Sequence, residues 1–328
     1  MQEILRLFPV EIQADVIKKI GNRWDMLQEI RVRLNQPLEF IFDHGIEWIS
    51  SVRPNKKDNI FMINQLSEFS LYRMEDELRE GYITIEGGHR VGIAGKVNTT
   101  NGSVKAIQYI TFLNIRIAKE KIGVANPIIP YLYENGFVNT LFVGSPQSGK
   151  TTLIRDVIRI ISSGWNHIGP KKVGVVDERS EIAACLNGIP QHNLGKRTDV
   201  LDACPKAEGM MMMIRSMSPE ILVVDEIGTE KDVQALTNAI NAGVTIICTM
   251  HGQSLDELKK RPSIKPLLEK KVFQRIILLK GQSSPGTIEK IYNENEKNLY
   301  QKSRCLPNEV DRGTAVHQRD NMARIRVE

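Results

Sequence analysis

The sequence lacks any long hydrophobic run. A helix that crosses a bilayer needs about 18–20 apolar residues in succession, and no stretch approaches that length. The first ten residues include Glu3 and hold no long apolar block, so we expect no signal peptide. With 328 residues, 41% hydrophobic and 25% charged, the composition indicates about two globular domains. We therefore expect a cytoplasmic protein without a membrane anchor of its own.

Cysteine and histidine are also scarce. Four cysteines are scattered along the chain without a CxxC pair, at Cys185, Cys204, Cys248 and Cys305. Six histidines show no spacing typical of metal ligands. These absences argue against a disulfide framework and a zinc site, and we interpret the cysteines as buried thiols in a reducing compartment.

The chain has neither a strong charge excess nor many aromatic residues. Its net charge is +5 and its aromatic content is 6%. A protein that binds single-stranded nucleic acid generally clusters Lys and Arg beside aromatic side chains that stack on bases. The first 120 residues or so mix both signs of charge instead. We therefore do not expect nucleic acid as a partner.

The first part of the chain mixes helical and strand patterns. Helical spacing of apolar residues spans 4–20, and an amphipathic pattern spans 66–81. Alternating residues predict strands within 30–42, 82–97 and 110–118. These elements together predict an α+β domain over residues 1–124.

From residue 125 the pattern changes to short apolar runs separated by helical segments. The runs are TLFVGS, KVGVVDE, EILVVDE, VTIICTM and FQRIILL. Such runs are typical of a mostly parallel sheet with helices on both faces. We therefore predict an α/β fold, a RecA-like P-loop core, over residues 125–293. Residues 294–328 are polar and aperiodic, and we predict a disordered tail there.

A phosphate-binding loop follows the first of these runs. GSPQSGKT at 144–151 matches GxxxxGK[ST] and lies between an apolar strand and an amphipathic helix. Its glycines let backbone N–H groups surround phosphates, and the helix contributes its positive end. Lys150 would reach the β- and γ-phosphates, and the Thr151 hydroxyl would bind Mg²⁺. We predict ATP and Mg²⁺ as cofactors, with the nucleotide held by Gly144, Ser145, Pro146, Gln147, Ser148, Gly149, Lys150, Thr151 and Thr152.

Two later apolar runs end in paired carboxylates. Asp225 and Glu226 close ILVVDE, and Asp177 and Glu178 close VGVVDE. A P-loop site needs a carboxylate from a neighbouring strand for Mg²⁺. We expect Asp225 to hold Mg²⁺ through water, and Glu226 to orient or deprotonate the attacking water.

The earlier acidic pair has two interpretations. Glu178 is a second candidate for catalysis, because it also follows an apolar strand. The alternative is structural, since Arg179 can pair with Asp177, Glu178 or Glu181.

A methionine-rich helix precedes the Asp225 strand. Four of its apolar residues share one helical face, which we expect to pack on the sheet: Met210, Met213, Ile214 and Met217. Pro205 suits the first turn, and Pro219 ends the helix. Met211 and Met212 lie off that face, where they could contact a neighbouring subunit.

Residues 210–252 resemble the segment from the Walker B strand to the His box in the type II/IV secretion and pilus-retraction ATPases. VVDERSEI at 175–182 is similar to the Asp box of that family. The chain resembles a sporulation member of this superfamily still more closely, and that resemblance extends to about Tyr292. It rests in part on the segments EIRVRLNQPL and GYITIEGGHRVGIAGKV. Asp225 departs from the pattern, because many secretion ATPases have Gly there. Gly228 and Thr229 replace a frequent Arg-Asp, and we find no four-cysteine zinc insertion.

The resemblance implies a Mg²⁺-dependent ATPase motor in a homo-oligomeric ring, a hexamer. The partners it implies are membrane channel or secretion-complex proteins on the cytoplasmic face. For the sporulation member, the ring lies on the mother-cell side of the forespore membrane and energises the channel there.

The same resemblance implies catalytic cations and a sensor. Arg90 and Arg116 lie on strands where such enzymes carry arginines, and each would complete the nucleotide site of a neighbouring chain. The alternative for both is a salt bridge. Arg215 and Arg197 are further candidates, and His251 is the candidate γ-phosphate sensor, with a buried structural histidine as its alternative.

Three functions remain open at this point. The first is the ATPase motor, and the second is a nucleic-acid-dependent ATPase of RecA-like build, because one core serves both. The third is a scaffold that binds ATP with negligible turnover. The complete set of Lys150, Thr151, Asp225 and Glu226 argues against the third.

Overall fold

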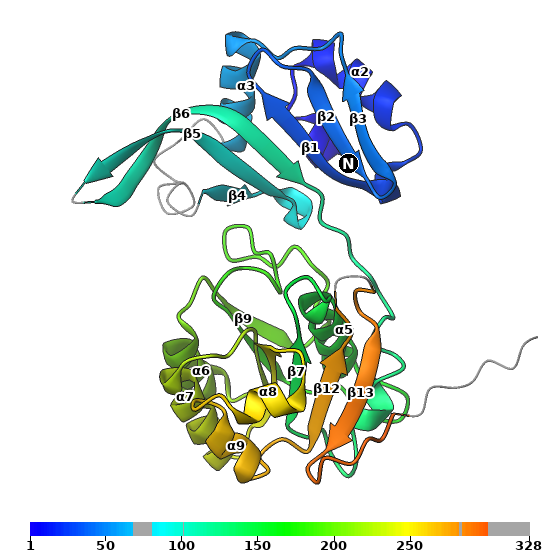
Figure 1. Ribbon diagram of the computed structural model, residues 1–328, viewed down its shortest axis with the longest axis vertical. Coiled ribbons are helices and arrows are strands. Elements are labelled where there is room, and N and C mark those ends of the chain that lie inside the picture. The colour runs from blue at the N-terminus through cyan, green and yellow to red at the C-terminus, as the bar shows by residue number, and fades with distance from the viewer. Residues whose placement is uncertain (68–80, 101, 282–283, 301–328) are drawn as a thin grey trace, which may run out of the picture.

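The computed structural model describes residues 1–67, 81–100, 102–281 and 284–300. The chain forms two lobes, each built on its own sheet (Figure 1). The first lobe has a six-stranded antiparallel sheet and the second a seven-stranded, mostly parallel one. Within the described part of the chain, no helix combines the length and apolar character that crossing a bilayer requires.

The first lobe orders its strands β3-β2-β1-β6-β5-β4. Their bounds are β1 Leu27–Arg33, β2 Leu38–Phe42, β3 Gly45–Ile49, β4 Tyr82–Thr84, β5 Arg90–Thr100 and β6 Ser103–Arg116. The long β5–β6 hairpin projects from the lobe (Figure 1). Buried apolar residues of the sheet and the helices form one core.

The helices of the first lobe differ from the predicted pattern. They are α1 Gln2–Leu5, α2 Val10–Ile20 and α3 Lys56–Leu66, with short 3-10 turns at Trp24–Met26 and Glu86–Gly88. The predicted helix over 4–20 is two helices, because Pro9 lacks an N–H and caps the second one. The helix predicted over 66–81 falls mainly on 68–80, outside the described residues. Helix α3 begins at a capping box formed by Asn55 and Asp58.

The second lobe orders its strands β13-β12-β7-β11-β10-β8-β9, and only β13 is antiparallel to its neighbour. Their bounds are β7 Thr140–Gly144, β8 Val173–Asp177, β9 Thr198–Asp202, β10 Ile221–Val224, β11 Thr245–His251, β12 Arg275–Leu279 and β13 Ile288–Asn293. The five apolar runs form β7, β8, β10, β11 and β12. The carboxyl ends of β7, β8, β10 and β11 therefore meet at one edge of the sheet.

Helices cover both faces of this sheet. They are α5 Lys150–Ser163, α6 Lys206–Met217, α7 Glu230–Asn241, α8 Leu255–Lys259 and α9 Lys265–Glu269, with a 3-10 turn at Ile129–Leu132. Val223 joins the core that contains α5, whereas Leu222 and Val224 join the core that contains α6 and α7. This alternation explains why the strands read as continuous apolar runs, since both of their faces are buried.

The connection between the lobes is anchored to α5. The buried Asp156 carboxylate accepts the backbone N–H of Ala125 at 2.8 Å and pairs with Arg159. At the other end of the second lobe, Leu299 donates to the carbonyl of Ile291. The first residues of the predicted disordered tail, 294–300, therefore contact β13 and are ordered there. Residues 301–328 lie outside the described residues.

The methionine helix α6 packs on the sheet over only part of the predicted face. Met210 and Met213 are buried, and a Cβ at Gly174 of β8 would lie 2.5 Å from the Met213 side chain. Met217 was expected in the core but is 43% exposed, because α6 ends there and the chain turns at Ser218. Met212, which lies off the face that carries the buried Met210 and Met213, is 47% exposed.

Shortening Met210 should destabilise the second lobe. We expect Met210→Ala to lower the free energy of unfolding by about 2–5 kcal/mol, because it leaves a cavity between α6 and the sheet. Met212→Ala is the matched control on the same helix and should stay within about 0.5 kcal/mol of the wild type. Urea unfolding followed by circular dichroism measures both, and equal losses would contradict the packing described.

Candidate active site

The phosphate loop runs from the end of β7 at Gly144 to the start of α5 at Lys150. Gly149 has a φ of +88°, and a Cβ there would lie 2.5 Å from the backbone nitrogen of Gly286. Gly286 in turn donates its N–H to the carbonyl of Ser148 at 2.8 Å. Only glycine fits at position 149, because the segment before β13 closes over the loop.

Lys150 points back into the loop that carries it. Its Nζ lies 2.9 Å from the carbonyl oxygens of Gly144 and Ser145, and 3.1 Å from Nδ1 of His251. Burial lowers the pKa of Lys150, and the nearby Asp225 and Glu226 carboxylates oppose that effect. The ammonium group is therefore held at the base of the loop, where a phosphate would approach.

Asp225 accepts hydrogen bonds from a residue of α5 and a residue of β11. The Thr151 hydroxyl donates to its Oδ2 at 3.1 Å, and the Thr249 hydroxyl donates to its Oδ1. Thr249 also accepts the backbone N–H of Glu226 at 2.8 Å. Glu226 has a φ of +53°, a left-handed conformation that is unusual for glutamate. This backbone turn directs the Glu226 side chain toward β11.

His251 joins Lys150 to Glu226. The Lys150 ammonium has only donors, so Nδ1 of His251 must accept. The ring proton then lies on Nε2, which faces Glu226 Oε1 at 2.6 Å. The other carboxylate oxygen, Oε2, accepts from Arg179 Nη1 at 2.9 Å. Both oxygens of Glu226 are thus engaged.

These side chains line one cavity of about 490 Å³. That volume suits a nucleotide-sized ligand. The predicted site residues that line it are Pro146, Gln147, Gly149, Lys150, Thr151, Thr152, Asp225, Glu226, His251 and Arg116.

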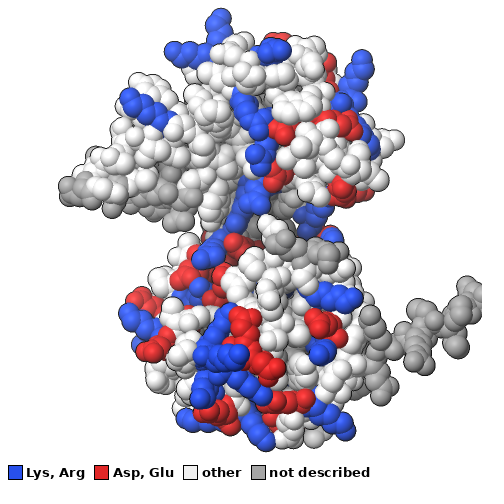
Figure 2. All heavy atoms as spheres, in the orientation of Figure 1, with Lys and Arg blue, Asp and Glu red and all other residues white. Residues whose placement is uncertain are grey.

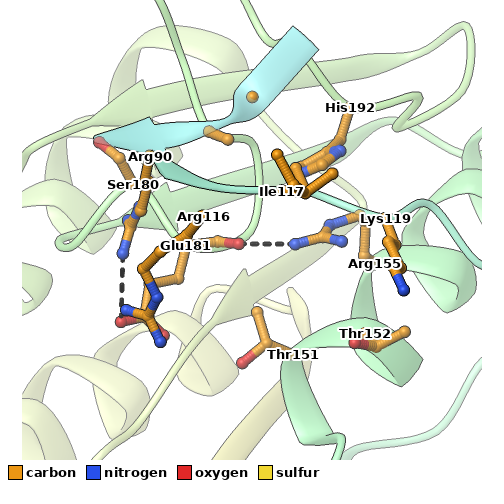
Figure 3. Close-up of a pocket in the computed structure, with 13 residues that line it drawn as sticks. Arg90, Arg116, Ile117, Lys119, Thr151, Thr152, Arg155, Ser180, Glu181 and His192 are labelled. Atoms are coloured by element: carbon orange, nitrogen blue, oxygen red, sulfur yellow. Dashed lines mark hydrogen bonds and ion pairs between the residues drawn. The ribbon is translucent and has the colours of Figure 1, made fainter. Parts of the chain in front are cut away.

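A second cavity of about 350 Å³ adjoins the first between the lobes and shares Arg116, Thr151 and Thr152 with it (Figure 3). Arg90 lines this second cavity. Arg116 therefore lines both cavities, and Arg90 lines only the smaller one. Arg116 also lies 3.6 Å from Glu29, and Arg90 lies 3.8 Å from Glu181.

Other predicted residues lie away from these cavities or are turned elsewhere. Glu178 pairs with Lys206 of α6. Arg215 donates to the carbonyl of Met211 on its own helix, and Arg197 donates to the carbonyl of Pro170.

Asp177 shapes the loop that follows β8. Its buried carboxylate accepts the backbone N–H groups of Glu181, Ile182 and Ala183 at 2.8–2.9 Å. Burial raises the pKa of Asp177 to about 6, although these hydrogen bonds act in the opposite direction. Both oxygens of Asp177 therefore accept hydrogen bonds from the backbone, and the carboxylate does not line the larger cavity.

Sequence reasoning gave no role to several residues of the site. Arg179 was considered only as a partner for the acidic residues near it, yet it reaches Glu226 on another strand. Arg155 on α5 donates to the carbonyl of Glu181, as Figure 3 shows, and to the carbonyl of Ile182. No function was assigned to Thr249 of the His box from the sequence, although its hydroxyl contacts Asp225 and Glu226. The only local signals were an arginine after VVDE and a hydroxyl two residues before His251.

The oxygen atoms beside the phosphate loop fit a hard divalent cation. Thr151 Oγ1 and Asp225 Oδ2 are 3.1 Å apart, so one ion could contact both. Among the described residues, no group of three or more His, Cys, Asp or Glu side chains could form a complete protein cage for a metal. Two protein oxygens supplemented by phosphate and water are typical of Mg²⁺.

Comparison with solved structures gives the fold. The Legionella pneumophila ATPase DotB aligns with a TM-score of 0.55 at 14% identity, covering 81% of this chain and 75% of DotB. The pilus retraction motor PilT with bound ADP aligns with a TM-score of 0.56 at 15% identity, covering 80% and 77%. The predicted fold class, a P-loop ATPase core preceded by a smaller α+β part, is confirmed.

Comparison of sequences gives the family. The family model for sporulation stage III, protein AA matches residues 1–299. Stage III sporulation protein AA of Bacillus subtilis is 49% identical over 295 residues, which cover 90% of this chain and 96% of that protein. The uncharacterized protein ycf45 of Porphyra purpurea is 25% identical over 82% of this chain and 43% of its own length. This chain therefore belongs to the sporulation stage III protein AA family.

Proposed function

We propose that this chain is a Mg²⁺-dependent ATPase that serves as the motor subunit of a secretion-type complex. The single observation that carries the proposal is the convergence of Lys150, Thr151, Asp225 and Glu226 on one cavity. The chain belongs to a sporulation family and has the fold of secretion and pilus ATPases, which supports the same conclusion.

Each residue has a distinct part in the proposed reaction. Lys150 and the backbone N–H groups of the loop hold the β- and γ-phosphates. Thr151 and Asp225 hold Mg²⁺, which neutralises phosphate charge when bound. Glu226 orients the attacking water and accepts its proton. His251 fixes the Glu226 carboxylate and lies beside Lys150, where the γ-phosphate would be sensed.

Arg116 and Arg90 supply positive charge from the first lobe. Arg116 lines both cavities, so its guanidinium can approach phosphates bound by its own chain. A guanidinium stabilises the charge that spreads over a phosphoryl group during transfer. We propose that Arg116 serves its own chain and that Arg90 organises the loop beside it.

The biological setting is also a proposal. A hexameric ring would dock on membrane channel proteins from the cytoplasmic side, as the family resemblance implies. In a sporulating cell this is the mother-cell side of the forespore membrane. Glu178 and Arg215 face α6 or its surface rather than the cavities, so any role for them would be in docking or ring contacts.

The nucleic-acid-dependent ATPase is the second candidate, and the charge distribution does not favour it. On the face in Figure 2, a band of Lys and Arg atoms runs from the first lobe to where the lobes meet, and Asp and Glu atoms lie beside and below it. Arg31 and Arg33 on the first sheet pair with Glu29 and Glu39. An ATPase assay with and without DNA or RNA separates the two candidates, and we expect no stimulation.

Replacing Lys150 should abolish nucleotide binding. We expect Lys150→Ala to lose Mg-ATP binding in isothermal titration calorimetry and to lose turnover, because no other ammonium group lies in the loop. The matched control is Lys171→Ala, which removes an equal charge that pairs with Glu220 before β10. Turnover by Lys150→Ala equal to that of the wild type would reject the assignment.

Replacing Glu226 should separate binding from chemistry. Glu226→Gln keeps the shape of the side chain and removes its capacity to accept a proton. We expect Mg-ATP affinity to be retained while turnover falls about 10²–10⁴-fold, the usual contribution of a general base. Single-turnover kinetics and equilibrium binding on the same preparation measure both quantities. Lost affinity with normal turnover per bound ATP would show that Glu226 binds nucleotide instead.

Mixing two inactive variants should test which chain Arg116 serves. Arg116→Ala should lose turnover, and mixing it with Lys150→Ala should restore nothing, because Arg116 lines the cavity of its own chain. A transition-state arginine is worth about 10³–10⁵-fold, so small recoveries are measurable. Arg31→Ala on the adjacent strand is the control and should stay active. Recovery in mixtures that form rings would mean that Arg116 serves a neighbour.

A further inference from the structure

Arg179 lies where the two lobes touch. Its backbone carbonyl accepts a hydrogen bond from Arg90 Nη2 and another from the Tyr82 hydroxyl at 3.3 Å. The Arg90 guanidinium stacks on the Tyr82 ring, 4.6 Å from its centroid. Strands β4 and β5 of the first lobe therefore hold the main chain of residue 179 in the second lobe.

The side chain of Arg179 extends in the other direction, to the proposed catalytic base. Its Nη1 donates to Glu226 Oε2 at 2.9 Å, in the larger cavity. The same residue thus receives contacts from the first lobe through its backbone and contacts Glu226 through its side chain.

The loop around Arg179 is fixed on its far side. Residues 181–183 donate three backbone N–H groups to the buried Asp177 carboxylate, and Ser180 donates its hydroxyl to Asp202. Residue 179 precedes these anchors, so the contact with Tyr82 and Arg90 sets its position. A movement of the first lobe would shift Arg179 relative to Glu226 and leave Asp177 in place.

The ion pair with the Arg179 guanidinium holds Oε2 of Glu226 in a fixed direction, so the carboxylate cannot turn freely within the cavity. His251 contacts the other carboxylate oxygen of Glu226, so each oxygen faces a hydrogen-bond donor. We infer that Arg179 is a positioning residue that restrains Glu226 while the lobes touch through Tyr82 and Arg90, and releases it when they separate. This inference rests on the proposed function, since it assigns regulation to the same site.

Removing the guanidinium should accelerate hydrolysis. We expect Arg179→Ala to raise kcat about two- to fivefold with KM for ATP unchanged, a range set by the small strength of exposed ion pairs. The Arg179 side chain is 63% exposed, so a larger effect is not expected. Arg179→Lys keeps a cation and should return kcat toward the wild-type value. Lys259→Ala, which breaks the exposed pair with Glu296, is the control and should leave kcat unchanged.

Tyr82→Phe tests the connection between the lobes. It removes one hydrogen bond to the Arg179 carbonyl and keeps the ring beneath Arg90, so kcat should rise by a smaller factor. In the double variant with Arg179→Ala, kcat should equal that of Arg179→Ala alone, because both changes release the same restraint. Tyr109→Phe on the exposed part of β6 is the matched control for the loss of a hydroxyl and should have no effect.

Hydrogen exchange provides a readout that needs no turnover. Tyr82→Phe should increase exchange at the backbone amides of residues 178–180 and leave those of 181–183 protected, since Asp177 still binds them. A lower kcat for Arg179→Ala would overturn the inference and assign Arg179 to transition-state binding. Multiplicative effects in the double variant, or unchanged exchange, would also overturn it. Absence of turnover in the wild type would reject the proposed function itself.

Discussion

The parallel register of β7, β10 and β11 is the constraint on which the site depends. Gly144 pairs with His251, and Val224 pairs with Cys248. These pairings bring the end of the phosphate loop strand beside the histidine and place Asp225 one residue beyond the last pair of β10. A shift of one residue in either pairing would move every side chain of the shifted strand to the other face of the sheet. The contacts of Lys150 with His251 and of Thr151 with Asp225 follow from this register.

The second constraint is the loop after β8. In sequence it looks like a second acidic site, but burial and three backbone hydrogen bonds turn Asp177 into an anchor for the chain. Glu178 then points to α6, and Arg179 points to Glu226. One buried carboxylate thereby decides which of its neighbours reach the cavity. The same anchoring supports Arg155, whose guanidinium binds the carbonyls of residues 181 and 182.

The first lobe contributes to the site through its last strands rather than through its core. Arg90 begins β5 and Arg116 ends β6, and the two residues pair in the sheet. Both therefore lie at the edge of the first lobe that faces α5 and the loop after β8, where Figure 3 shows them around Glu181. Both arginines line the smaller cavity, and Arg116 also lines the larger one. The proposed coupling between the lobes and the catalytic glutamate depends on that placement.

The sequence alone determined the elements whose information is local. The phosphate loop is encoded by eight consecutive residues, and the apolar runs specify buried parallel strands because both faces of each run are apolar. Asp225 and Glu226 followed from their place at the end of such a run. The end of α6 before Pro219 was predicted, but the break at Pro9 and the exposure of Met217 were missed, because periodicity does not show which residues of an apolar face are covered.

Only the tertiary structure decided which distant side chains meet. Arg179 and Glu226 are 47 residues apart in the chain, and Tyr82 is 97 residues from the carbonyl that its hydroxyl contacts. Nothing in the local sequence distinguishes Glu178 from Arg179 as the residue that faces the cavity, because the choice depends on the burial of Asp177 and the packing of the two lobes. The strands and motifs are set by short-range pattern, whereas the charges around Glu226 are set by long-range contacts.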